Sequence, residues 1–419
     1  MPNFRYDNPA DALDDLLARL SPVESESVSL NEAAGRVLAE PLVADRDSPP
    51  HDVSAMDGYA VRVADVAGLD AGDPALPLAG EVPIGTDPPT LPPKSALRIY
   101  TGSCVPHGAD AVIQREHTRE PDGLIASDGS QRVTITVPVD GIVVGQNIRR
   151  RGENLRENEA VIPSGVPINH AVVAALASFG SSAPVVYKRV RAAAIVTGDE
   201  LLAVDSSPPP WRIRDSNGPT LNALLASRRY VSCTQARHVR DDLRTLTESI
   251  EKELGSHELL VLTGGVSMGQ HDHVPQAIKD AGGTVLFHRL PIRPGKPILA
   301  AIGPSGQAIL ALPGNPLAVV AASVLFVLPA IRKLAGFADP LPVHQSATVT
   351  DGGGDPTKTI PLYWYRPASF THEYDAAILP SQGSGDTTSA ARADGLIELP
   401  PNHLQHPKPG YRFFPYHQP

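Results

Sequence analysis

Acidic and glycine-rich turns follow most of the predicted strands in residues 190–334. Because the carboxyl ends of parallel strands meet at one edge of a sheet, we expect these turns to converge there. Backbone N–H groups at glycine-rich turns and helix starts bind anions, and carboxylates bind a hydrated cation such as Mg²⁺. The pattern predicts a pocket for a phosphorylated or oxyanionic ligand with a metal ion, whereas any single acidic residue here could be only a helix cap. The turns are Asp199-Glu200, Asp215-Ser216, Asp241-Asp242, Gly264-Gly265 and Pro313-Gly314-Asn315-Pro316.

A basic loop supplies the complementary charge. Residues 289–297 carry Arg289, Arg293 and Lys296 on a segment stiffened by prolines. Fixed cations of this kind make charge-assisted contacts to an oxyanion, and the alternative is an exposed basic turn. The loop is not a P-loop, because Pro297 occupies the Ser/Thr position. The run Arg149-Arg150-Arg151 alone indicates a solvated face.

Two further motifs suggest chemistry that their context does not favour. Gly265-Val266-Ser267-Met268-Gly269 matches the nucleophile-elbow pattern of serine hydrolases, but the next helix is predicted to begin only near His273. His271-Asp272-His273 suggests a zinc site, but adjacent residues rarely ligate one metal without further ligands. We expect neither a serine nucleophile nor zinc.

Strands and helices alternate through residues 190–334, which predicts a doubly wound α/β sheet. We expect strands at 190–196, 230–239 and 259–262. A helix should run from Asp215-Ser216-Asn217 to Arg229, and others should cover 243–254 and 274–281.

The segments before residue 190 and after residue 336 have sequence patterns that differ from this alternation. Asn8 and Pro9 should begin a helix with a leucine stripe, and Asn169 should cap another that ends at Gly180. Short β-like runs alternate with proline and glycine turns in 52–138, and again after Gly336, so we expect a small β domain in each place.

Composition narrows the function class. The 419 residues carry a formal charge of −10, which argues against nucleic-acid binding, and Cys104 and Cys233 lack metal or redox spacing, which favours an intracellular setting. The N-terminus has no signal-peptide pattern. The longest apolar run, 317–331, is about 15 residues and contains Pro329, so we expect a buried helix, no membrane insertion and a cytoplasmic protein.

Together these stretches resemble the MoeA/gephyrin family of molybdopterin molybdotransferases. They follow the family order and cover nearly everything from Ser54 to Gly336. The matching stretches are Ser54-Ala55-Met56-Asp57-Gly58-Tyr59-Ala60-Val61, Arg98-Ile99-Tyr100-Thr101-Gly102, Asn147-Ile148-Arg149-Arg150-Arg151-Gly152-Glu153, Thr197-Gly198-Asp199-Glu200-Leu201, Asp215-Ser216-Asn217, Arg240-Asp241-Asp242, Thr263-Gly264-Gly265-Val266-Ser267-Met268-Gly269 with Asp272, Pro294-Gly295-Lys296-Pro297 and Leu312-Pro313-Gly314-Asn315-Pro316.

The resemblance implies a multidomain α/β plus β architecture with four domains. Residues 1–46 and 153–180 would form an elongated, discontinuous N-terminal dimerisation domain, into which a small β domain, 47–152, is inserted. Residues 181–335 would form the α/β molybdopterin-binding domain and 336–419 a C-terminal, barrel-like β domain. The resemblance also implies a homodimer whose cleft lies between the α/β domain of one subunit and the inserted domain of its partner.

The implied reaction takes adenylylated molybdopterin and molybdate, hydrolyses the adenylate with Mg²⁺, releases AMP and leaves molybdenum on the dithiolene. Asp57 and Thr101 would come from the partner subunit, and Glu200, Asp241 and Asp272 would supply catalytic and metal contacts. Substrate contacts would come from Asp215, Ser216, Gly264, Gly265, Ser267, Arg289, Arg293, Lys296, Pro313, Asn315 and Pro316.

Departures from the family pattern support a second possibility. Asn154 stands after Glu153 where the family usually has aspartate, and arginines stand at 289 and 293 where lysine is common. Arg366 and Ser389 are our candidates for the molybdate contacts of the C-terminal domain. A gephyrin-like scaffold that binds a short peptide of a partner protein there, with little or no transferase activity, is the alternative, and Tyr363-Trp364-Tyr365 could serve it.

Overall fold

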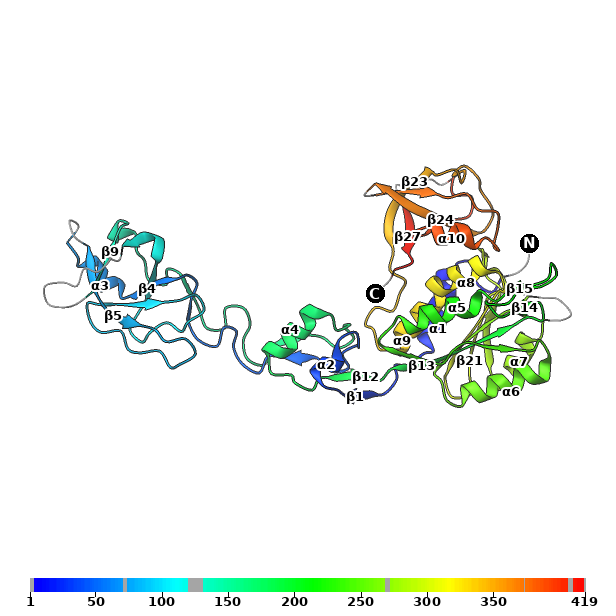
Figure 1. The fold of residues 1–419 in the computed structure, drawn as a ribbon, viewed down its shortest axis with the longest axis horizontal. Helices are drawn as coiled ribbons and strands as arrows, with labels where there is room; N and C mark the ends of the chain where they lie inside the picture. Colours follow the sequence, from blue (N-terminus) through cyan, green and yellow to red (C-terminus); the bar gives the residue numbers. More distant parts are fainter. Residues whose placement is uncertain are drawn as a thin grey trace. The chain divides into compact units, whose positions relative to one another are not determined.

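The computed structural model describes residues 4–70, 74–119, 131–267, 272–372, 374–405 and 410–417. The chain divides into two compact units (Figure 1). The larger comprises residues 1–40, 163–177 and 181–419, and the smaller comprises residues 41–162 with 178–180.

The larger unit contains a mixed sheet in the order β16-β13-β18-β22-β21-β19, with β17 also pairing with β13. Strands β13, β16, β17, β18 and β22 pair in parallel, whereas β21 runs antiparallel to both of its neighbours, β22 and β19. The doubly wound sheet that the sequence predicts is therefore confirmed. The strands are β13 (Val190–Thr197), β16 (Val231–Cys233), β17 (Arg237–Val239), β18 (Leu259–Thr263), β19 (Thr284–His288), β21 (Leu299–Ile302) and β22 (Ala308–Leu312).

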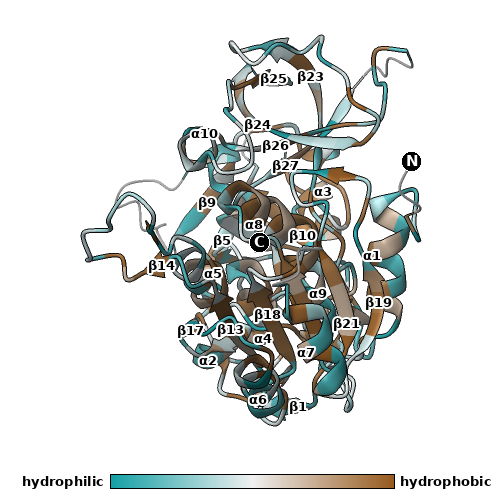
Figure 2. Ribbon diagram, turned by 90° about the vertical axis from the view of Figure 1, so that its right-hand side faces the viewer, coloured by the Kyte–Doolittle hydropathy of each residue, from teal (hydrophilic) through white to brown (hydrophobic). Residues whose placement is uncertain are grey.

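Strand alternation sends side chains to two separate cores. Leu259 and Val261 of β18 pack on one face with α1 (Pro9–Ala18), α5 (Asn217–Ala226), α8 (Pro316–Ala322) and α9 (Leu328–Leu334). Leu260 and Leu262 pack on the other face with α6 (Leu243–Leu254) and α7 (Val274–Asp280). Strands covered on both faces are apolar throughout, as the brown colour of β13 and β18 shows (Figure 2).

Local signals predict several helix starts correctly. The Asn8 carboxamide accepts a hydrogen bond from Ala10 N–H at 3.0 Å, and the Asp242 carboxylate accepts one from Thr245 N–H at 2.9 Å. Asn169 caps α4 (His170–Ser178) in the same way. Each cap satisfies N–H groups that have no partner within the helix.

One expectation about an element was wrong. The strand expected at 230–239 is split into β16 and β17, because the chain leaves the edge of β13 after Cys233 and rejoins it at Arg237. The buried helix expected at 317–331 is confirmed, because α8, the π-helical segment Ser323–Val327 and α9 follow one another directly and Pro329 lies in the first turn of α9.

The resulting helix, Pro316–Leu334, has 19 residues. It is the one helix in the described part of the chain whose length and composition would suit a membrane span, but 89% of its most apolar window is buried inside the protein. The helix therefore belongs to the core of the α/β layer.

The C-terminal region closes into a five-stranded barrel. Its strands pair in the order β24-β25-β23-β27-β26, and β26 pairs back to β24. The bounds are β23 (Gln345–Asp351), β24 (Tyr363–His372), β25 (Asp375–Ile378), β26 (Gly395–Leu399) and β27 (Tyr411–Pro415), with α10 (Thr387–Arg392) before β26. The short strand β20 (Ile292–Arg293), which lies in the basic loop, adds to β24 in parallel.

The larger unit also contains β1 (Ser25–Ser27), which pairs with β12 (Val185–Tyr187), and α2 (Leu30–Ala33).

The smaller unit holds a six-stranded sheet in the order β7-β4-β6-β5-β9-β8. These strands are β4 (Gly58–Val61), β5 (Ala75–Glu81), β6 (Ala96–Ile99), β7 (Ala111–Gln114), β8 (Thr118–Arg119) and β9 (Arg132–Ile135). The expected boundaries of the four domains stay a prediction.

Candidate functional site

Three turns that follow parallel strands meet at one edge of the α/β sheet. Gly264 follows β18 with φ +95°, and a Cβ there would lie 2.1 Å from the carbonyl oxygen of Thr197 at the end of β13. A Cβ on Gly265 would lie 3.2 Å from Asp241 Oδ1, in the turn after β17. Only glycine allows the backbone of Gly264 to approach β13 so closely. We call these three turns the acidic rim.

Asp241 is the most perturbed carboxylate of the acidic rim. Burial raises its pKa, the neighbouring His273 and the Thr197 hydroxyl act in the opposite direction, and the negative charges of Asp199 and Asp272 raise it further. Within the described residues, Asp241 Oδ1 and Thr197 Oγ1 are buried without a hydrogen-bond partner. A buried carboxylate oxygen near further carboxylates fits a cation.

The described residues contain no group of three or more His, Cys, Asp or Glu side chains that could hold a metal ion by themselves. This arrangement still suits Mg²⁺, which typically takes one or two carboxylates and completes its shell with water and substrate phosphates. The charges of Asp199 and Asp272 both act on Asp241, so these carboxylates are the candidates to share a cation with it.

Glu200 lies in the same turn as Asp199, and both residues are exposed to solvent. Its carboxylate folds back over Gly198, where a Cβ would lie 2.8 Å from Oε2. His238 Nε2 lies 2.9 Å from the carbonyl oxygen of Gly198 and Arg212 donates to that of Asp199 at 2.5 Å, so this turn is held from two sides.

Asp215 caps helix α5. Its Oδ1 accepts hydrogen bonds from the backbone N–H groups of Asn217 and Gly218, both at 2.9 Å. Ser216 is the N-cap residue itself, and its carbonyl accepts a hydrogen bond from Thr220 Oγ1. The structure thus gives Asp215 the capping role that the sequence left as an alternative to ligand binding.

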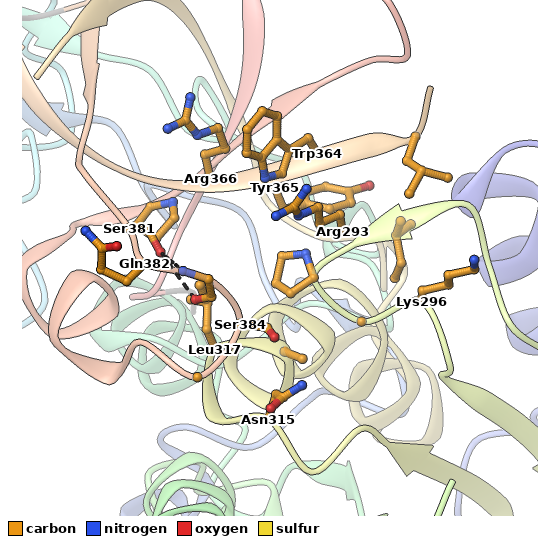
Figure 3. A pocket seen from close by; sticks show the side chains of 18 of the residues that line it. Arg293, Lys296, Asn315, Leu317, Trp364, Tyr365, Arg366, Ser381, Gln382 and Ser384 are labelled. Atoms are coloured by element: carbon orange, nitrogen blue, oxygen red, sulfur yellow. Dashed lines mark hydrogen bonds between the residues drawn. The ribbon is translucent and has the colours of Figure 1, made fainter. Parts of the chain in front are cut away.

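A cavity of about 950 Å³ lies between the basic loop, the turn after β22 and the C-terminal barrel (Figure 3). We call it the oxyanion cavity. It brings together five predicted substrate residues: Arg293, Lys296, Pro313, Asn315 and Arg366. Ser389 joins through its neighbour Ser381, which lines the cavity and accepts a hydrogen bond from Ser389 Oγ at 3.3 Å.

Arg366 is almost completely buried at the end of the barrel. Its guanidinium donates to the carbonyl of Asp355 at 2.8 Å and to that of Gly354. Burial lowers the pKa of Arg366, and the positive charge of Arg293 lowers it further. The cavity therefore holds two guanidinium groups close enough to repel each other.

The turn after β22 lines the oxyanion cavity and lies beside the acidic rim, because a Cβ on Gly314 would lie 3.7 Å from the Cα atom of Gly264. Pro313 and Asn315 line the cavity, and the carbonyl of Pro313 accepts a hydrogen bond from Thr263 Oγ1, at the end of β18. Other predicted residues do not line the cavity: Arg289, Pro316, Ser267, Gly264 and Gly265.

The structure also bears on the two rejected motifs. Strand β18 ends at Thr263 and α7 begins only at Val274, so Ser267 is not at a strand-to-helix corner. This geometry is unlike a nucleophile elbow. His271 lies outside the described residues.

The smaller unit contains the remaining predicted residues. Asp57 Oδ1 accepts hydrogen bonds from the backbone N–H and the hydroxyl of Thr101, both at 2.8 Å, and these bonds lower the pKa of Asp57. Asn154 Oδ1 accepts from Arg149 at 2.5 Å, and the same arginine donates to Glu153 Oε1 at 3.1 Å. The smaller unit therefore presents two exposed polar groups of residues: Asp57 with Thr101, and Arg149 with its two acceptors.

Sequence reasoning missed several residues of these sites. Thr197 and His273 lie near Asp241, and Lys358 and Ser381 line the oxyanion cavity, as does Trp364, which the sequence suggested only for peptide binding. Strand alternation carries a signal for one of them, because it places Trp364 on the same face of β24 as the predicted Arg366.

Comparisons with known proteins agree with this architecture. The MoeA N-terminal region (domain I and II) matches residues 8–180, and a probable molybdopterin binding domain matches residues 193–333. A molybdopterin molybdenumtransferase of Nostoc sp. is 35% identical over 343 residues, which cover 81% of this chain and 76% of the relative.

The chain belongs to the MoeA family. A molybdopterin molybdenumtransferase of Staphylococcus epidermidis is 32% identical over 90% of this chain and 88% of its own length. The MoeA protein of Pyrococcus horikoshii OT3 matches 98% of both chains with a TM-score of 0.79 and 26% identity. Because its relatives are molybdopterin molybdenumtransferases, this member of the MoeA family is a transferase of molybdenum cofactor biosynthesis.

Proposed function

We propose that this protein inserts molybdenum from molybdate into adenylylated molybdopterin, with Mg²⁺-dependent hydrolysis of the adenylate and release of AMP. The observation that carries this proposal is the turn 313–316, which lies against Gly264 of the acidic rim and lines the oxyanion cavity that contains the cations. Adenylylated molybdopterin has a phosphoanhydride, and molybdate is an oxyanion. A site that places carboxylates for Mg²⁺ beside cations for an oxyanion suits the reaction between them.

The oxyanion cavity would bind molybdate. Arg293, Lys296 and Arg366 supply positive charge on its wall, and Arg366 is backed by two carbonyls that fix its guanidinium. Guanidinium groups in fixed positions form directional, charge-assisted hydrogen bonds to oxyanions. We expect molybdate to be held there while the pterin dithiolene approaches.

The acidic rim would bind the adenylate end. Asp241 and Asp272 would hold Mg²⁺, which when bound neutralises charge on the phosphoanhydride. The backbone of Gly265 lies beside Asp241, and the N–H groups of this glycine turn would bind phosphate oxygens. Glu200, Asp215, Ser216 and Ser267 lie on neighbouring turns and would line the approach.

The remaining expectations concern assembly and location. A homodimer would let Asp57 and Thr101 of one subunit complete the acidic rim of the other, and this rests on the family resemblance. We also propose that the protein works in the cytoplasm, since the apolar helix Pro316–Leu334 is buried in the core of the protein.

Peptide binding is the second candidate function. A largely apolar pocket of about 160 Å³ is lined by Pro9, Leu13, Phe326, Pro342 and Phe414, beside the C-terminal barrel. Its size suits one side chain of a partner peptide. Of the aromatic run that suggested this role, Tyr365 lines this pocket although it is 2% exposed, whereas Trp364 lines the oxyanion cavity.

One assay decides between the two functions. The purified protein is incubated with adenylylated molybdopterin, molybdate and Mg²⁺, and AMP release and pterin-bound molybdenum are both quantified. Stoichiometric formation of both products supports the transferase. Absence of both, with a folded protein, overturns it and leaves peptide binding.

A further inference from the structure

Trp364, Arg293 and Arg366 form one cluster in the oxyanion cavity, and the geometry of strands β20 and β24 brings them together. In the parallel pair β20–β24, Arg293 is the register partner of Trp364. Trp364 and Arg366 are two residues apart on β24, so their side chains leave the same face of the strand. Tyr365 leaves the opposite face, where its hydroxyl donates to Glu398 at 2.9 Å.

Both guanidinium groups contact the indole ring. The Cζ atom of Arg366 lies 4.4 Å from the centroid of the Trp364 ring, and that of Arg293 lies 5.2 Å from it. In Figure 3 the two guanidinium groups lie on different sides of the indole. A cation within about 6 Å of an indole centroid is attracted by the negative face of the ring.

This contact offsets a like-charge repulsion. The positive charge of Arg293 contributes to lowering the pKa of Arg366, which shows that the two charges are felt across the cavity wall. Arg366 is also fixed from behind by the carbonyls of Gly354 and Asp355. Arg293 is exposed and comes from a loop, so among these contacts the indole is what holds it beside Arg366.

We propose that Trp364 is a positioning residue that holds Arg293 and Arg366 at a fixed separation for a tetrahedral dianion such as molybdate. It acts through the two arginines and does not itself contact the reacting atoms. The inference rests on the proposed function for the identity of the anion, and it gives Trp364 a role other than the peptide binding that the sequence suggested for it.

The chain offers a built-in reporter. It contains two tryptophans, and Trp211 is 78% exposed, so Trp211→Phe leaves Trp364 as the single indole. Sodium molybdate titrated into this variant should change the Trp364 emission saturably, because anion binding shifts the two flanking cations. Saturable binding without any change in emission would overturn the proposal.

Affinity variants test the mechanism. By isothermal calorimetry with molybdate alone, Trp364→Leu should bind about tenfold more weakly and Trp364→Phe about twofold more weakly, because phenylalanine keeps a weaker cation–π face. In an Arg293→Gln background the Trp364→Leu effect should shrink to about twofold, since the ring then has one cation fewer to position. Equal losses in both backgrounds, or no rescue by phenylalanine, would show that the ring only fills space.

Turnover separates this inference from the proposed function. In the insertion assay Trp364→Leu should raise KM for molybdate about tenfold and leave kcat nearly unchanged. If the wild type inserts molybdenum and Trp364→Leu leaves KM unaltered, the positioning role is wrong and the function stands. If calorimetry gives the expected pattern but the wild type inserts nothing, the function is wrong and the positioning role stands. Trp211→Leu is the matched control and should change neither quantity, while urea unfolding confirms that each variant folds.

Discussion

The side-chain nitrogen of Asn217, at the start of α5, donates a hydrogen bond to the carbonyl oxygen of Gly314 at 2.8 Å. The same nitrogen donates to Thr263 Oγ1 at 3.0 Å, so one buried amide joins the turn after β22 to the end of β18. The turn after β22 lines the oxyanion cavity and lies beside Gly264 of the acidic rim. Their relative position therefore depends on a residue that contacts neither proposed substrate.

Asn217→Ala should impair both stability and turnover. Removing two buried hydrogen bonds leaves their acceptors unsatisfied and should cost about 1–3 kcal/mol in the free energy of unfolding, measured by urea denaturation. The turn would also lose its anchor, so insertion activity should fall at least tenfold. Asn222→Ala is the control, because Asn222 on the same helix accepts one hydrogen bond from Ala236 N–H. It should lower stability without a comparable loss of activity, and equal losses in both variants would contradict the proposed anchoring role.

Asp241→Asn should lose most turnover while gaining stability. The raised pKa of Asp241 means that the folded state binds its proton more tightly than the unfolded state does. Ionisation therefore disfavours folding, an effect that is absent below the unfolded pKa of about 3.9 and complete above the folded one. The stability gain of the variant should grow as pH rises from about 4 towards 7, which urea midpoints across this range would show. A gain independent of pH would contradict the electrostatic cause.

Asp272→Asn should also lose most turnover, because it would remove the second carboxylate proposed to hold Mg²⁺. It should require higher Mg²⁺ for half-maximal activity, and it should lower the stability gain of Asp241→Asn in the double variant, since part of the repulsion is already gone. Unchanged turnover in both single variants would exclude the two carboxylates from the reaction.

A mixed dimer should recover activity that neither parent has. If Asp57 completes the acidic rim of the partner subunit, a heterodimer of Asp57→Ala and Asp272→Ala chains contains one intact site. Differently tagged chains, purified as heterodimers, should regain up to about half of the wild-type insertion rate per dimer. No recovery in verified heterodimers would place both residues in the same subunit's site or outside any site.

Asn154→Asp should change activity only modestly in a working transferase. Asn154 is exposed and its carboxamide oxygen already accepts from Arg149, which also pairs with Glu153. A carboxylate there would keep the arginine contact, and its effect on stability should stay within about 1 kcal/mol. Wild type nearly inactive, with turnover appearing only in Asn154→Asp, would instead favour the scaffold. In that case a partner peptide should still bind Asp241→Ala and Asp272→Ala.

Glu398→Gln should destabilise the barrel without altering molybdate affinity. Glu398 is buried, accepts from Tyr365, and pairs with Arg412 through contacts of 2.6 and 2.8 Å. Losing the charge should cost about 2 kcal/mol, because hydrogen bonds to charged groups are strong but Arg412 is partly solvated. Calorimetry should give the wild-type affinity, since this network leaves β24 on the side opposite Trp364. A weakened affinity would show that the two faces are coupled.

Sequence alone determined the features that depend on neighbouring residues. The cap at Asn8, the cap at Asp242, the apolar stretch of β18 and the glycine pair after it are all local signals, and each predicted element has its counterpart in the structure. The order of motifs also predicted the family and the doubly wound sheet, because alternating strands and helices leave few ways to bury their apolar faces.

Only the tertiary structure decided the features that depend on pairing between strands far apart in the sequence. The split of the strand expected at 230–239 depends on how the chain meets the edge of β13, which no local pattern encodes. The contact of Arg293 with Trp364 joins residues 71 positions apart in the sequence through a two-residue parallel register. The two-residue spacing of Trp364 and Arg366 places them on one face of β24, but only the addition of β20 gave that face its second arginine. Register between distant strands is selected by the burial of whole surfaces, so the residues themselves carry little signal for it.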